Sequence, residues 1–180
     1  MKESEQNQSL AYQRDVLEFA TVAVQFCAYM EEAEQHTRRE FVDTLLKLLP
    51  LLYIKGMLLT PFDTNDDVEL QDAVSEENYD IVRSNVAFVM GNRDDYLDVF
   101  VEDMRYSDTP ILMTVSENLA DMYQDVKNFC VAFRSEVEEC MLEAVAQCRQ
   151  NFEHYWGQKL VNVMRALHEV RFGETDDEEG

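Results

Sequence analysis

Apolar residues recur every three or four positions along most of the chain, which is the spacing of one helix face. Residues 10–34 are apolar over so wide an arc that we expect a central helix there. Residues 37–40 form a capping box, in which the Thr37 hydroxyl and the Glu40 carboxylate satisfy free amides, and they predict the start of a second helix. Pro50 predicts a kink in this helix, and Gly56 predicts its end.

The same periodicity predicts helices in the rest of the chain. Ser75 is expected to cap a third helix that ends at Gly91, and residues 92–104 are expected to form a short fourth helix. Capping boxes at 114–117 and 135–138 then open two long helices. Six or seven helices with mostly short connections predict an all-α, single-domain bundle in which neighbours are mostly antiparallel.

The seam of the last long helix contains an irregularity. It steps by four residues twice in succession, from Phe152 to Trp156 and from Trp156 to Leu160. Such a stutter locally unwinds a supercoil. Gly157 lies inside it, so we expect a bend or a close contact between helices at this point.

Charge separates a helical body from acidic segments. The 180 residues include 15 Lys and Arg against 37 Asp and Glu, which gives a net charge of −22. Eight acidic residues and no basic one lie within 63–80, and five more lie within 174–180. We therefore expect a polar N-terminal segment at 1–9, a helical bundle at 10–172 with a solvated acidic connection at 63–80, and an acidic tail at 173–180.

The acidic balance also limits the partners. It disfavours direct binding of nucleic acid and docking on anionic lipid, whereas it is compatible with a basic protein partner or with mimicry of nucleic acid. Residues 1–9 have no apolar region of a signal peptide, and the longest uncharged apolar stretch, 19–30, is too short to span a membrane. The four cysteines have no zinc or redox-pair spacing, so we expect reduced thiols and a cytoplasmic location.

Several stretches, taken in order, resemble a known family. They are LLPLLYIKG at 48–56, SDTP at 107–110 followed by SENLADMYQD at 116–125, and YWGQ at 155–158 followed by RALH at 165–168. Their order and spacing resemble the bacterial domain-of-unknown-function family 5063 over most of the chain. The resemblance implies a compact helical domain of bacterial origin, and it carries no catalytic assignment.

The sequence does not predict a metal site or a cofactor. A di-metal carboxylate bundle needs Glu three residues before His on two helices, and none of the three histidines has this neighbour. Glu117, Asp121 and Asp125 form an acidic stripe that faces away from the apolar seam, which is typical of a solvated surface.

Two clusters are candidates for function. Trp156, Arg165 and His168 could form a polar pocket near Gly157, where Arg165 would hold a carboxylate or phosphate and His168 would transfer a proton. Alternatively, Trp156 is a core residue, Arg165 forms an ion pair and His168 lies at the surface. Asp94, Asp98 and Glu102 would form an acidic ridge on the fourth helix that could recognise a Lys- and Arg-rich partner or could simply be solvated.

The sequence therefore favours a non-enzymatic interaction or scaffold module. An enzyme or small-molecule binder that uses the pocket near Trp156 is the alternative, and an acidic mimic of nucleic acid is a weaker one. The heptad seams leave open whether they pack within the chain or against a second copy in a homo-oligomer.

Overall fold

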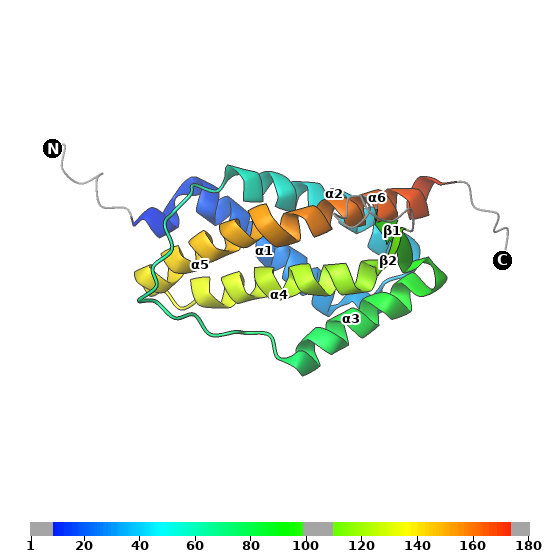
Figure 1. The fold of residues 1–180 in the computed structure, drawn as a ribbon, viewed down its shortest axis with the longest axis horizontal. Helices are drawn as coiled ribbons and strands as arrows, with labels where there is room; N and C mark the ends of the chain where they lie inside the picture. Colours follow the sequence, from blue (N-terminus) through cyan, green and yellow to red (C-terminus); the bar gives the residue numbers. More distant parts are fainter. Residues whose placement is uncertain (1–8, 99–109, 174–180) are drawn as a thin grey trace.

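Six α-helices run along an elongated bundle in the computed structural model, which describes residues 9–98 and 110–173 (Figure 1). The helices are α1 (Arg14–Glu31), α2 (Arg38–Leu58), α3 (Glu76–Met90), α4 (Val115–Phe133), α5 (Glu138–Asn151) and α6 (Gly157–Phe172). Short 3-10 turns lie at Leu10–Tyr12, Ala33–Gln35 and Gly91–Arg93. The all-α prediction is confirmed, and none of the helices in the described ranges is long and apolar enough to cross a membrane.

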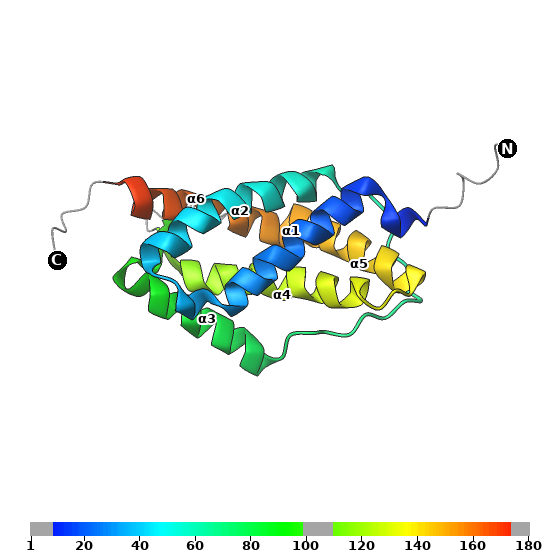
Figure 2. The same ribbon diagram turned by 180° about the vertical axis from the view of Figure 1, so that it is seen from behind.

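Helix α4 is the centre of the bundle, because it packs against α1, α3, α5 and α6. Helices α1 and α2 pack on each other, and α2 also packs on α6 (Figure 2). Helix α1 is less central than its sequence predicts. Its stripe from Val16 to Met30 is buried, but Leu17 and Val24 are exposed.

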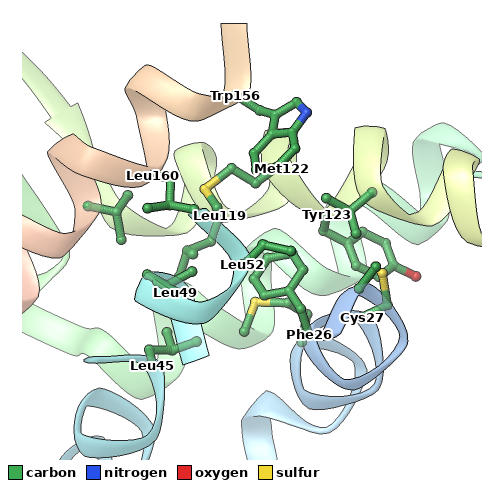
Figure 3. Close-up of a cluster of buried hydrophobic side chains, with 14 of the residues drawn as sticks. Phe26, Cys27, Leu45, Leu49, Leu52, Leu119, Met122, Tyr123, Trp156 and Leu160 are labelled. Atoms are coloured by element: carbon green, nitrogen blue, oxygen red, sulfur yellow. The ribbon is translucent and has the colours of Figure 1, made fainter. Parts of the chain in front are cut away.

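The core lies where the predicted seams of four helices meet (Figure 3). Its fully buried side chains include Phe26 of α1, Leu49 and Leu52 of α2, Met122 of α4, and Trp156. Burial of such large apolar side chains is the main favourable term in folding, typically about 1.5–3 kcal/mol for each.

The predicted helix ends are confirmed in part. Thr37 and Glu40 form the reciprocal capping box, and the hydroxyls of Ser75 and Thr114 cap α3 and α4. The predicted capping box at 135–138 does not form. The Ser135 hydroxyl accepts a bond from Val137 N, and no side chain caps α5.

Helix α2 runs through Pro50 and past Gly56, so the predicted end at Gly56 is also wrong. Gly56 instead makes room for another helix. A Cβ atom at this position would lie 3.2 Å from ring carbons of Phe152.

The fourth predicted helix is wrong in the part that the structure describes. Residues 95–98 form strand β1 (Asp95–Asp98), which pairs antiparallel with β2 (Ile111–Thr114). The pairing joins Asp95 to Thr114 and Asp98 to Ile111, and such distant partners leave no trace in helical periodicity. Residues 99–104 of the prediction lie outside the described residues.

Most residues of the acidic connection are exposed, as expected of a solvated segment, but the connection is also anchored to the bundle at a few points. Asn65 N donates to the buried Glu143 carboxylate at 2.6 Å, and Ala73 N donates to Asn128 Oδ1 at 2.7 Å. Val74 is buried in the core. The predicted N-terminal segment and acidic tail lie outside the described residues, apart from Ser9 and Gly173.

Candidate functional site

A π-helical turn, Phe152–Trp156, joins α5 to α6 where the seam has its stutter. The amide of Gly157 donates to Phe152 O, five residues earlier. A Cβ atom on Gly157 would lie 2.4 Å from that oxygen, so the wide turn needs glycine here. The predicted irregularity is confirmed, and π turns inside α-helices occur frequently at functional sites.

Beside this turn, polar side chains of α3, α4 and α6 form a hydrogen-bonded cluster centred on Asp121. Lys159 Nζ lies 2.9 Å from Asp121 Oδ2, and both side chains are at most 20% exposed. The Tyr79 hydroxyl donates to Asp121 Oδ1 at 2.7 Å, and Lys159 also donates to Asn118 Oδ1 at 3.2 Å. We call Tyr79, Asn118, Asp121, Tyr155 and Lys159 the Asp121 cluster.

Within the Asp121 cluster the charges are balanced. Lys159 lies 4.7 Å from the ring centroid of Tyr155, which adds a cation–π contact to its ion pair. Burial, together with the nearby Asp121 carboxylate, raises the pKa of Tyr155 to about 12. Both tyrosine hydroxyls therefore stay protonated at neutral pH, because burial and the same carboxylate also raise the pKa of Tyr79. The cluster holds three helices together and has no unpaired charge.

One turn along α4, Asp125 lies in a different environment. It lines a hollow of about 150 Å³ between α4, α5 and the acidic connection, which we call the Asp125 pocket. Its Oδ1 accepts a bond from Asn151 at 3.2 Å, whereas its Oδ2 is buried without a hydrogen-bond partner among the described residues. Burial raises the pKa of Asp125 to about 6, and the Asp121 carboxylate contributes in the same direction.

Amide side chains complete the wall of the Asp125 pocket. Asn128 accepts from Ala73 N through Oδ1, and Gln147 donates to Glu143 through Nε2 at 2.6 Å. The other polar atom of each amide makes no bond to the described part of the chain. The pocket therefore offers the carboxylates of Asp72 and Asp125 and several amide groups to a small polar ligand.

The cysteine that lines the Asp125 pocket is not an activated nucleophile. Cys148 is buried, and burial raises the pKa of its thiol well above the usual value. A thiol attacks as its thiolate, so Cys148 stays in the unreactive form at neutral pH.

The structure brings together two of the three residues predicted for the polar pocket. Arg165 and His168 line a hollow of about 560 Å³ beside β1, which we call the hairpin hollow. Arg165 donates to Leu97 O of β1 at 2.5 Å. Trp156 is elsewhere: it is fully buried in the core, where its Nε1 donates to Cys148 O at 3.1 Å (Figure 3).

The prediction of an acidic ridge along a helix is wrong for its described residues, because 95–98 form a strand. The Asp94 carboxylate accepts bonds from the amide and the hydroxyl of Ser116 at 2.8 and 2.6 Å, so it caps α4. Asp98 lies at the end of β1 and accepts a bond from Asn162 at 3.4 Å. Glu102 lies outside the described residues.

The interpretation of the stripe on α4 as solvated surface is wrong for two of its three residues. Glu117 is exposed, but Asp121 and Asp125 are covered by α3, α5 and the connection. A signal was present in the sequence, because Asn118 and Asn128 continue the same stripe with amide groups that suit a covered polar face. The residues that cover the stripe come from distant segments, which periodicity does not reveal. No group of three or more potential metal ligands occurs within 9–98 and 110–173.

Comparisons with known proteins place the chain in a family. Residues 11–173 match the family model described as "Domain of unknown function (DUF5063)". The crystal structure of protein BF1032 from Bacteroides fragilis superposes with a TM-score of 0.84 at 42% identity, over 92% of this chain and 98% of that one. No curated protein matches. The chain therefore belongs to the DUF5063 family.

Proposed function

We propose that this protein is a non-enzymatic interaction module that receives a cationic group, an ammonium or a guanidinium, in the Asp125 pocket. The observation that carries the proposal is the buried Oδ2 of Asp125, which lines a hollow and has no hydrogen-bond partner among the described residues. A buried acceptor without a partner costs about 1–3 kcal/mol, so a donor from a ligand would be favoured there.

The size and charge of the pocket support a side chain of a basic partner rather than a whole metabolite. A volume of about 150 Å³ suits the tip of a lysine or arginine. Asp72 of the acidic connection lines the pocket together with Asp125, and no basic residue does so within the described residues. A cation held between them would favour the ionised form of Asp125 and lower its raised pKa.

Two features of the neighbouring residues support a role without catalysis. Lys159 and Asp121 neutralise each other, and the Cys148 thiol is held protonated.

Two of the stretches that resemble the family, 116–125 and 155–158, meet at the Asp121 cluster beside the pocket. A reducing, cytoplasmic location fits the four cysteines, all of which are free thiols.

Titration of the ¹⁵N-labelled protein with ethylguanidinium and ethylammonium tests the proposal. We expect saturable shifts of the amide signals of Asp125, Asn128 and Asn151 at pH 7.5, and we expect Asp125→Asn to weaken binding about tenfold or more. The neutral probe propanamide should bind more weakly. Asp80→Asn is the matched control, because it removes the same charge from an exposed position on α3.

Shifts that do not saturate, or equal weakening by Asp80→Asn and Asp125→Asn, would show that the cations respond only to the overall charge. Tighter binding of propanamide than of both cations would also refute a cation site.

A small-molecule binder at the hairpin hollow is the second candidate. It is favoured by the volume of about 560 Å³ and by the presence of Arg165 and His168 on one wall. Its charge is balanced, since Asp95 and Glu169 also line it. A ligand there would contact Arg165, so Arg165→Gln would weaken its binding and leave the response of Asp125 to cations unchanged.

A further inference from the structure

A third hollow, of about 330 Å³, lies between the start of α2 and the end of α6. Three arginines line it, Arg38, Arg39 and Arg171, together with Val42 and Val170, and we call it the arginine hollow. No acidic side chain lines it among the described residues. The hollow differs in this respect from both the Asp125 pocket and the hairpin hollow, and it lies in a protein with a net charge of −22.

The position of two of these arginines is locally unfavourable. Arg38 and Arg39 are the first two residues of α2, after the Thr37 cap. The N-terminus of a helix carries a partial positive charge that favours acidic side chains in the first turn. Arg14 holds the equivalent position at the start of α1, so this placement alone does not mark a site and the hollow is needed as well.

Two of the guanidinium groups are held in place. Arg38 Nε donates to Val89 O at 3.3 Å, and its Nη2 lies against Gly91, where a Cβ atom would approach it to 2.8 Å. Arg171 Nε lies 2.5 Å from Asp43 Oδ1. Each of these contacts uses only part of the five-donor fork, so both groups keep N–H donors for a further acceptor.

Arg39, whose side chain is exposed to solvent, is the one of these three arginines without a partner among the described residues. It makes no hydrogen bond or ion pair to any other residue of 9–98 and 110–173. Its charge adds to those of two fixed neighbours at the same hollow, which favours an anion that can accept bonds from several guanidinium groups at once.

We infer that the arginine hollow binds a phosphate group, either as inorganic phosphate or as a phosphate monoester. Carboxylates are matched by a single guanidinium fork, whereas a phosphate dianion has three peripheral oxygens that accept from two or more. The partial positive charge at the start of α2 acts in the same direction. The volume leaves room for part of the group that carries the phosphate. This site is separate from the Asp125 pocket.

The test is a titration at low ionic strength, followed through the Nε–Hε signals of the arginines in ¹H–¹⁵N spectra. Inorganic phosphate, methyl phosphate and acetate are the probes. We expect saturable shifts of the Arg38, Arg39 and Arg171 signals with phosphate or methyl phosphate, and binding weakened about tenfold or more in Arg39→Gln. Binding of methyl phosphate would identify a monoester site, and binding of inorganic phosphate alone a site for the free anion.

Arg14→Gln is the matched control. Arg14 is also the first residue of its helix, its side chain is 91% exposed, and it lines neither the arginine hollow nor the Asp125 pocket. It should bind phosphate as the wild type does, and the far-ultraviolet circular dichroism of both variants should be unchanged.

Three results would overturn the inference. The first is the absence of saturable shifts with either phosphate probe, and the second is equal weakening by Arg14→Gln and Arg39→Gln. The third is binding of acetate as tight as that of both phosphates, which would indicate a carboxylate site.

Discussion

The Asp125 pocket and the arginine hollow are built on opposite imbalances of hydrogen bonding. In the pocket, a buried carboxylate oxygen has no donor among the described residues, whereas in the hollow the solvent-exposed guanidinium of Arg39 has no acceptor among them. The Asp121 cluster lies beside the pocket and has no such imbalance, because Lys159 and Tyr79 satisfy its carboxylate. Charged residues alone therefore do not lead us to propose a site; each proposed site has an unmatched charged group beside a hollow.

The two regions also depend on the bundle in different ways. The Asp125 pocket is formed by α4, α5 and a connection without regular structure, and the arginine hollow by the ends of two helices that pack on each other. Variants that act on the shared core, on the neighbouring cluster and on the pocket itself should separate these contributions.

Trp156→Ala should have the largest effect, because it acts on the core that supports both regions. Trp156 is fully buried, its ring lies 4.8 Å from that of Phe152, and its Nε1 is hydrogen-bonded. Truncation of a buried tryptophan costs about 3–5 kcal/mol, and urea unfolding would measure it. Trp156→Phe keeps an aromatic ring and should lose less. A loss below about 1 kcal/mol in the alanine variant would mean that the core repacks around the gap.

Lys159→Met should destabilise the protein by about 1–3 kcal/mol, because it leaves the Asp121 carboxylate largely buried without its cation. Phosphate binding at the arginine hollow should be retained at urea concentrations where the variant is folded. The matched control is Lys127→Met, which removes a more exposed partner of Glu31 and should cost less than about 1 kcal/mol. Equal losses in the two variants would contradict the special role of the Asp121 cluster.

Asp125→Asn should have the smallest effect on stability and the clearest pH dependence. The pKa of this carboxyl is raised from 3.8 to about 6, so the folded state binds more protons than the unfolded state between these values. The contribution of Asp125 to the free energy of unfolding therefore falls as pH rises from about 4 to about 6. Relative to the wild type, Asp125→Asn should gain about 1 kcal/mol over this range, allowing for the partial exposure of Asp125.

Urea unfolding of both proteins at pH 4, 5, 6 and 7 would measure this difference. A difference that is constant with pH would show that Asp125 titrates normally, and the imbalance on which the comparison rests would then be wrong.

Periodicity and capping predicted most of the fold, because both signals come from residues that are close together in the sequence. The Thr37 box, the Gly91 end and the stutter at Trp156 all have the predicted structural counterpart. The β1–β2 hairpin could not be predicted in the same way, because Asp95 pairs with Thr114 across a long gap in sequence.

The sites were less predictable, because their character depends on what covers a residue. Arg165 and His168 share a hollow as expected, since they are one turn apart on one helix. The burial of Asp125 is not predicted from the sequence, because it depends on how α5 and residues 70–72 of the connection cover α4. In the sequence Arg39 is only one residue of the 37–40 capping box, because its hollow is completed by Arg171, which is distant in sequence.

The π turn also determines where the length of the chain can change. The seam of the last helix, from Met141 to Leu167, would alternate regularly between steps of four and three if one residue were removed between Phe152 and Trp156. A deletion there can be absorbed by a return to α-helical geometry. A deletion within α6, before Arg171, would instead rotate every later side chain by about 100°, including Arg171 at the arginine hollow. The chain thus carries one surplus residue, held in the turn that contains Tyr155.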